Sequence, residues 1–309
     1  MKSPLFFAKI LLFGEYGIIK NSKGLSIPYN FFMGTLQWAD QENQTTEASH
    51  QNLCDYAAFL KTLTPDLVRL DWEHLQADLN RKLYFDSSIP QGYGVGSSGA
   101  LVAAFYDRYA RDKISPEEAL TPQKLTRLKT IFAAMESYFH GQSSGLDPLN
   151  SYLSLPLLIH SKDKIETTGL PAQHEQGNGA VFLLDSGSSG ETAPMVSLFM
   201  ENMKEEAFSK MMREEFIQMT DRCVNNFLKG NLKSLFGNMK SLSALVLKYF
   251  KPMIPKEFHE LWKKGIDSNT YYLKLCGSGG GGYILGFTED FKAAQKTLEA
   301  YRLDVVYYF

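Results

Sequence analysis

The chain of 309 residues is 44% hydrophobic and 21% charged, so it has enough apolar material for one large domain or two medium ones. Its net charge of −2 argues against a partner such as nucleic acid or an anionic membrane. Three widely spaced cysteines suggest neither a disulfide framework nor a zinc site, and no apolar run reaches the ~18 residues of a membrane span. We therefore expect a cytoplasmic protein without a signal peptide.

The first apolar run, Leu5 to Phe13, predicts a buried strand that contains a charged residue, Lys9. A lysine inside such a strand is unfavourable unless it is paired, has a function, or reaches solvent from an edge strand. A second strand is expected from Ser26 to Leu36, broken at Pro28. The polar stretch from 39 to 50 is typical of a loop.

Residues 90–100, PQGYGVGSSGA, form a glycine- and serine-rich loop that opens directly into an apolar helix. The glycines allow another group to approach closely, and the hydroxyls of Ser97 and Ser98 stand where capping groups belong. Because a helix N-terminus binds anions, the loop indicates a phosphate site, although a plain turn that caps a helix is an equal alternative. It is not a Walker A loop, since no Lys-Ser/Thr pair follows the last glycine.

Acidic residues follow in the next helix and loop. A helix is expected from Thr121, the cap, to His140. Glu136 shares its apolar face, so this carboxylate either reaches solvent at the edge of the stripe or points into a site. The segment from His140 to Leu153 is expected to be a loop that contains Asp147.

The second half of the chain alternates strands and helices. Strands are expected over 180–185, 271–275, 283–287 and 303–309, with helices over 196–249, 256–264 and 289–301. This order resembles a split β-α-β unit. Four consecutive glycines, 279–282, lie between two of the strands, which indicates close approach to another backbone or to a ligand rather than a simple hairpin turn.

Three motifs resemble, in order and spacing, those of the GHMP small-molecule kinases: KILLFGEY (9–16), PQGYGVGSSGA (90–100) and KLCGSGGGG (274–282). ESYFHGQSSGLD (136–147) and LLDSGSSGETAPMV (183–196) are similar to segments of the mevalonate kinases within that superfamily. The resemblance covers nearly the whole chain. The chain departs from it at Phe7-Ala8, where Pro-Gly is usual, at Tyr16, where His is common, and at Ser143, where Pro is usual.

The resemblance implies a role for each motif. Asp147 and Lys9 would be catalytic at the attacking hydroxyl, with Asp147 acting either as general base or as the group that orients the hydroxyl. Ser98 and Glu136 would hold Mg²⁺, and Glu15 and Tyr16 would contact the substrate. The residues implied in binding ATP are Pro90, Gly92, Gly94, Gly96, Ser97, Ser98 and Gly99. The site residues implied in the third glycine motif are Gly277, Gly279 and Gly280.

The fold implied by the resemblance is α/β (α+β), with two domains and the active site in the cleft. Residues 1–178 would form the ATP-binding domain, and residues 179–309 a ferredoxin-like domain with extra helices. The implied activity is ATP- and Mg²⁺-dependent phosphorylation of the primary hydroxyl of mevalonate, a small-molecule substrate, by a possible homodimer. Two alternatives stay open: a kinase for another alcohol or a phosphorylated acceptor, such as phosphomevalonate or a sugar, and a silent nucleotide-binding relative.

Overall fold

The structure, a computed structural model, describes residues 3–39, 43–161, 164–174 and 177–309. The chain forms two compact units, each made of several segments. Unit 1 consists of Met1–Lys9, Ile27–Pro90 and Gly96–Leu155; unit 2 consists of Ile10–Ser26, Gln91–Val95 and Pro156–Phe309. The units therefore alternate along the chain, and the expected domain boundary near residue 178 stays a prediction.

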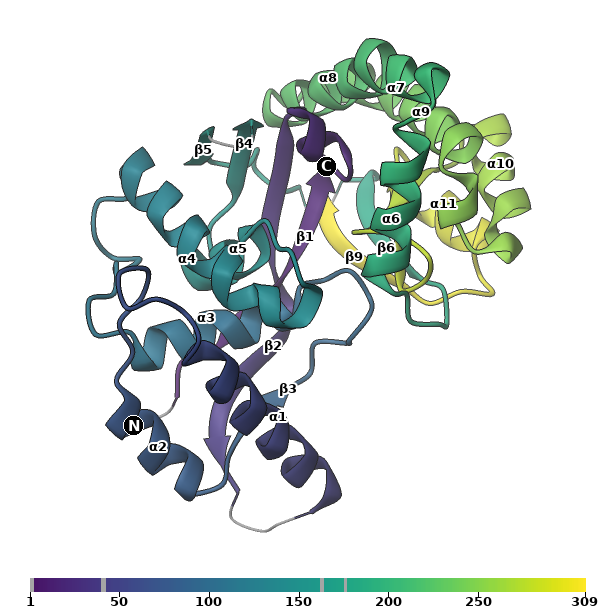
Figure 1. Cartoon of the computed structure of the whole chain (residues 1–309). Helices are drawn as coiled ribbons and strands as arrows, with labels where there is room; N and C mark the ends of the chain where they lie inside the picture. The colour runs from purple at the N-terminus through teal and green to yellow at the C-terminus, as the bar shows by residue number, and fades with distance from the viewer. Residues whose placement is uncertain (1–2, 40–42, 162–163, 175–176) are drawn as a thin grey trace. The chain divides into compact units, whose positions relative to one another are not determined.

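Unit 1 is rich in helices. Its complete elements are α1 (Gln44–Leu60), α2 (Trp72–Asn80), β3 (Leu83–Ser87), α3 (Ser97–Tyr109), α4 (Pro122–His140) and α5 (Leu146–Leu153). It also contains the start of β1 (Phe6–Phe13) and most of β2 (Gly24–Trp38), which pairs antiparallel with β3. Helix α3 packs against both α4 and α5 (Figure 1).

Small residues bring α3 close to its neighbours. Gly99, Ala100 and Ala103 are buried along this helix, so its backbone can approach α5. A Cβ on Gly99 would stand 2.7 Å from the backbone carbon of Asp147. The apolar helix predicted after the loop is therefore largely buried, and its first turn lies directly on the first turn of α5.

Unit 2 is built on a four-stranded antiparallel sheet in the order β7-β8-β6-β9. Its strands are β6 (Ala180–Asp185), β7 (Tyr272–Leu275), β8 (Tyr283–Thr288) and β9 (Leu303–Tyr308). Helices separate β6 from β7 and β8 from β9, which gives the ferredoxin-like order and confirms the split β-α-β unit. Two further strands, β4 (Leu157–Ser161) and β5 (Lys164–Thr167), pair with each other, and β4 also pairs with residues 24–26 of β2.

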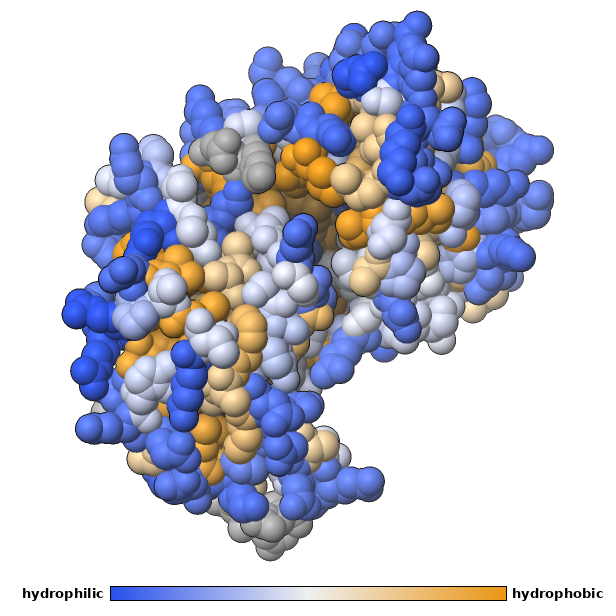
Figure 2. Space-filling view, viewed as in Figure 1, coloured by the Kyte–Doolittle hydropathy of each residue, from blue (hydrophilic) through white to orange (hydrophobic). Residues whose placement is uncertain are grey.

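The helices of unit 2 lie mostly between β6 and β7, as expected. They are α6 (Thr192–Asn202), α7 (Glu206–Met211), the π-helical turn η2 (Met212–Phe216), α8 (Ile217–Leu228), α9 (Leu232–Tyr249) and α10 (His259–Ser268), with the short helices η1 (Gly17–Lys20), η3 (Lys251–Met253) and η4 (Lys256–Phe258) and, before β9, α11 (Phe291–Thr297). The helices break at Gly230, between α8 and α9, and the Asn231 side chain caps α9. On the face seen in Figure 2 the surface over α7 and α8 is mainly hydrophilic.

Four local expectations were wrong or incomplete. The polar stretch after residue 39 is largely helical: α1 begins at Gln44, because Asn43 and Thr46 form a capping box, while residues 40–42 lie outside the described structure. Strand β2 continues through Pro28, which lies between the segments paired with β4 and β3. The loop expected after His140 contains α5, and α2 was not expected.

Among the described residues, no helix is long and apolar enough to cross a bilayer.

Candidate active site

A lysine and an aspartate form the centre of a polar cluster in unit 1. Lys9 Nζ lies 2.9 Å from Asp147 Oδ1; the lysine side chain is 5% exposed and the aspartate side chain 37% exposed. β1 supplies the lysine, and the first turn of α5 supplies the aspartate. The interpretation of Lys9 as an edge-strand lysine that reaches solvent is thus excluded, because its ammonium is buried against a carboxylate.

The backbone of the glycine-rich loop packs closely against the Lys9–Asp147 pair. Gly96 lies beside both side chains, and a Cβ there would stand 3.0 Å from Lys9 Cγ and 3.7 Å from Asp147 Oδ2. Gly96 is also the N-cap residue of α3 and takes a left-handed conformation, with φ of 82°, that favours glycine. The glycine therefore allows the helix N-terminus to reach the ion pair.

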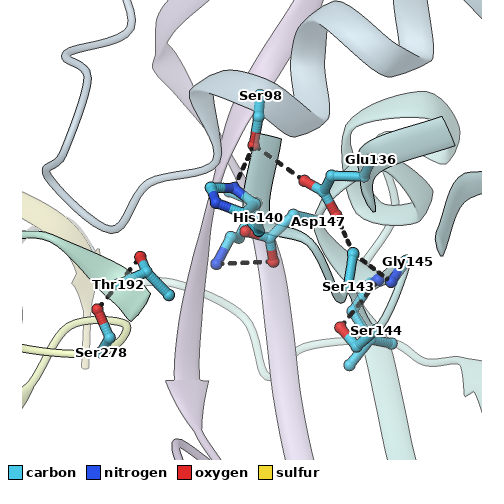
Figure 3. Close-up of polar contacts among 11 residues, drawn as sticks. Ser98, Glu136, His140, Ser143, Ser144, Gly145, Asp147, Thr192 and Ser278 are labelled. Atoms are coloured by element: carbon cyan, nitrogen blue, oxygen red, sulfur yellow. Dashed lines mark hydrogen bonds and ion pairs between the residues drawn. The ribbon is translucent and has the colours of Figure 1, made fainter. Parts of the chain in front are cut away.

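The N-terminus of α3 has no side-chain cap. The prediction that Ser97 and Ser98 cap the helix was wrong: they are its first two residues, and the cap residue is Gly96. Ser98 instead directs its hydroxyl to Glu136 Oε1, at 3.0 Å (Figure 3). The N-cap Gly96 offers no side-chain acceptor to the first backbone N–H groups of α3, and a helix N-terminus of this kind can bind an anion.

Glu136 is the buried acid of the cluster. It is 3% exposed, so it does not lie at the solvent edge of α4, and the hydroxyls of Ser98 and Ser143 donate to its two oxygens (Figure 3). Burial and, second, the charge of Asp147 raise the pKa of Glu136 to about 7, against the lowering effect of the two serines and Lys9. A cation bound at these oxygens would favour the ionised carboxylate.

The hydroxyl and carboxylate oxygens fit Mg²⁺. This ion prefers hard oxygen ligands and usually takes one or two from protein, with the rest from phosphates and water. Ser98 has one proton, which it gives to Glu136, so its oxygen lone pairs are available for another partner; His140 Nε2 lies 3.1 Å from this oxygen. Within the described residues no group of three His, Cys, Asp or Glu side chains could hold a metal ion.

A second cluster, in unit 2, brings three glycine-containing segments together. Gly94 would meet Cys276 O at 2.4 Å if it carried a Cβ, and Gly92 would meet Ser189 Cβ at 2.9 Å. Gly190 N donates to Gly92 O at 2.8 Å. Gly277, Gly279 and Gly280 also lie within 3.1 Å of neighbouring atoms by the same measure. The expected close approach of the glycine stretch to another backbone is confirmed.

Glu15 and Tyr16 lie inside unit 2. Lys274 Nζ contacts Glu15 Oε1 at 2.5 Å, and these side chains are 4% and 6% exposed. Tyr16 packs on Phe199 and donates its hydroxyl to Ser278 O at 2.6 Å. Burial, with the charge of Glu15, raises the pKa of this phenol. Both residues thus have partners within the unit, and their predicted contact with a substrate stays a prediction.

The structure sorts the predicted site residues by unit. Unit 1 brings together Lys9, Gly96, Ser98, Gly99, Glu136 and Asp147, with Ser97 beside them on α3 and Pro90 at the end of the segment Ile27–Pro90. Unit 2 holds the remaining glycines with Glu15 and Tyr16. Sequence reasoning assigned no role to His140, Ser143 or Lys274. A signal existed for Ser143, which replaces a usual proline, and for Lys274, a lysine that opens the third motif.

No protein-family model matches the sequence, and no curated protein matches it. Solved structures match over almost the full chain. L. major mevalonate kinase in complex with R-mevalonate is 17% identical over 97% of this chain and 92% of its own, with a TM-score of 0.64. Methanococcus jannaschii mevalonate kinase is 16% identical, over 100% of this chain and 98% of its own, with a TM-score of 0.62.

A third match is Streptococcus pneumoniae phosphomevalonate kinase in complex with phosphomevalonate and AMPPNP. It is 12% identical over 99% of this chain and 100% of its own, with a TM-score of 0.62. These likenesses show the fold: the mixed α/β, GHMP kinase architecture expected from the three motifs is confirmed, and mevalonate kinases are among its structural neighbours.

Proposed function

We propose that the protein is an ATP- and Mg²⁺-dependent, cytoplasmic small-molecule kinase that transfers the γ-phosphoryl group to the primary hydroxyl of mevalonate. The observation that carries the proposal is the Lys9–Asp147 ion pair beside the uncapped N-terminus of α3, in a chain with this fold. The pair supplies an acceptor for a hydroxyl proton and a cation for developing charge, next to a site suited to phosphate.

Phosphoryl transfer depends mainly on positioning and on stabilisation of charge. Asp147 is the more exposed member of the pair, so an alcohol could approach its carboxylate and donate a hydrogen bond to it. Whether it removes the proton or orients the hydroxyl, the acceptor oxygen is placed beside Lys9. The ammonium of Lys9 would stabilise negative charge on the attacking oxygen and the transferred group, a task for which the loop offers no Walker lysine.

The nucleotide phosphates would be bound by backbone N–H groups of the loop from Pro90 to Gly99. Mg²⁺ would be held by Ser98 and Glu136, where it would neutralise phosphate charge. The glycine contacts in unit 2 support this assignment indirectly, because they fix the backbone of Gly92 and Gly94 against the third motif. Gly277, Gly279 and Gly280 would then shape the loop rather than bind phosphate by side chains.

A coupled ADP-release assay tests the proposal. Purified protein receives ATP, Mg²⁺ and, in turn, mevalonate, phosphomevalonate, homoserine and galactose, with Asp147→Asn as control. We expect turnover on mevalonate that falls by about 10²–10⁴-fold in Asp147→Asn, the range of general acid–base catalysis. Turnover on another alcohol alone would overturn the mevalonate assignment and keep the kinase. Nucleotide binding without turnover on any alcohol would favour a silent relative.

A phosphorylated acceptor is the second candidate, because the phosphomevalonate kinase matches the fold about as well as the mevalonate kinases do. Turnover on phosphomevalonate in the same assay would select it. The silent relative is disfavoured, since such a protein has no need to keep Lys9, Glu136 and Asp147 in contact distance of their partners. Homodimer formation stays a prediction from the family.

A further inference from the structure

Ser143 connects the helix that carries Glu136 with the helix that carries Asp147. Its hydroxyl donates to Glu136 Oε2 on α4, and its oxygen accepts the backbone N–H of Gly145 at 2.9 Å (Figure 3). Gly145 is the N-cap residue of α5, two positions before Asp147. A single hydroxyl thus joins the buried acid to the helix start that positions the exposed one.

Ser143 acts as a donor toward Glu136 and as an acceptor toward Gly145. A serine hydroxyl has one proton to donate, and Ser143 gives it to Glu136. The Ser143 oxygen also accepts the N–H of Gly145. A rotation of the side chain about its Cα–Cβ bond would therefore break both hydrogen bonds. With Ser98 on Oε1, both oxygens of Glu136 receive a donor, which fixes the rotation of the carboxylate.

We propose that Ser143 is a positioning residue that holds the Glu136 carboxylate in the orientation required for the metal–nucleotide complex and couples it to the start of α5. The part of this inference that concerns metal binding rests on the proposed function. Residues that orient metal ligands in this way typically contribute 10–100-fold to metal affinity.

The neighbouring Ser144 provides a matched control. Its oxygen also accepts a backbone N–H of α5, from Leu146 at 3.3 Å, but within the described part of the chain the hydroxyls that donate to Glu136 are those of Ser98 and Ser143. Ser144→Ala therefore removes the same group from the same loop. Ser143→Thr keeps the hydroxyl and serves as the conservative variant.

The metal arm measures binding of Mn²⁺ to the full chain with AMPPNP, by the loss of the free Mn²⁺ signal in electron paramagnetic resonance. Ser143→Ala is expected to weaken Mn²⁺ binding by about tenfold or more, Ser143→Thr to restore most of it, and Ser144→Ala to change it less than about twofold. Equal binding by Ser143→Ala and the wild type, or equal losses in the two alanine variants, would overturn the proposal.

The apo arm separates failure of this inference from failure of the proposed function. Urea unfolding at pH 8 without metal or nucleotide is measured for Ser143→Ala, Glu136→Leu and the double variant. Each single substitution already breaks the Ser143–Glu136 hydrogen bond, so the double variant does not lose it a second time. Because this hydrogen bond is made to a charged group, we expect a coupling of about tenfold in the unfolding equilibrium constant. Additive effects would refute the Ser143–Glu136 link. Coupling without Mn²⁺–AMPPNP binding by the wild type would refute the metal role and the kinase.

Discussion

Two of the lysine–carboxylate pairs have a buried lysine, and these two pairs differ in how far the carboxylate is exposed. In unit 1, Lys9 is buried but the Asp147 side chain is 37% exposed. In unit 2, the side chains of Lys274 and Glu15 are both buried, with 4% and 6% of their surface exposed. The first pair can offer a carboxylate to a substrate, whereas the second joins Glu15 of the first motif to Lys274, the first residue of the third motif.

The surroundings of the two pairs fit this difference. The Lys9–Asp147 pair lies beside Gly96, the N-cap residue of α3, which makes no side-chain cap hydrogen bond. The pocket next to Lys274 is lined mainly by apolar side chains such as Phe216, Val246 and Phe250. A buried ion pair in apolar surroundings costs much to break, while a half-exposed one leaves a carboxylate that water can solvate. Matched substitutions should separate chemistry from stability.

The largest effect is expected for Lys9→Met in the kinase assay. Loss of one preorganised cation should lower kcat by about 10²–10³-fold, as removal of a single charge-stabilising donor typically does. Stability should change little, because the remaining Asp147 is partly solvated. Chemical unfolding of the same samples checks this second point. A variant that keeps its activity would remove Lys9 from the reaction.

Lys274→Met should show the opposite behaviour. It leaves Glu15 charged and closed from solvent, so the free energy of unfolding should fall by about 3–5 kcal/mol, the range for a buried pair that loses one partner. The double variant Glu15→Leu/Lys274→Met should recover most of this loss, because no buried charge is left. Urea unfolding measures both. If the single and double variants were equally unstable, lost packing rather than charge would explain the effect.

The sequence predicted the parts of the molecule that depend on local pattern. The strand around Lys9, the Thr121 cap of α4 and the alternation of strands and helices after residue 179 all follow from apolar spacing and capping residues. The start of α1 was missed, because most residues between Gln44 and Asn52 are polar. Helix α5 was missed because Gly, Asp and Pro near its start are typical of turns.

Contacts between distant segments could not be predicted without the resemblance. Nothing local to Glu15 specifies that Lys274 will pair with it, since 259 residues separate them. The role of Ser98 shows the limit of local rules most clearly. Capping preference predicted a cap, but its hydroxyl serves Glu136 because Gly96 takes the cap position. Tertiary contacts decided the use of a hydroxyl that local sequence had placed correctly.

The raised pKa of the buried Glu136 makes the stability of unit 1 depend on pH. The pKa of Glu136 is raised from 4.5 to about 7, so between these values the folded protein binds more protons than the unfolded chain. The contribution of this group to stability is therefore fully present below about pH 4.5 and is lost as pH rises through 7. The total is about 3 kcal/mol at most.

Glu136→Gln removes this titration and provides the measurement. Relative to the wild type, the variant should gain about 2–3 kcal/mol in the free energy of unfolding between pH 5 and pH 8, without metal or nucleotide. Ser144→Ala serves as a neutral control. Parallel pH profiles for the wild type and Glu136→Gln would show that the carboxylate is not held at a raised pKa.

The smallest effect tests how tightly the glycine segments of unit 2 meet. Gly94 and Gly187 have the same φ of 76°, but a Cβ on Gly94 would lie 2.4 Å from Cys276 O and one on Gly187 would meet nothing within 4 Å. Alanine at either position carries the same backbone strain, of about 1–2 kcal/mol for a left-handed conformation. Only Gly94→Ala adds a collision with backbone, so it should be less stable than Gly187→Ala by a further 1–3 kcal/mol or so. Urea unfolding of the two variants gives the difference directly. Equal stabilities would mean that the loop can move away from the third motif. Glycine would then be required at position 94 only for its left-handed backbone conformation.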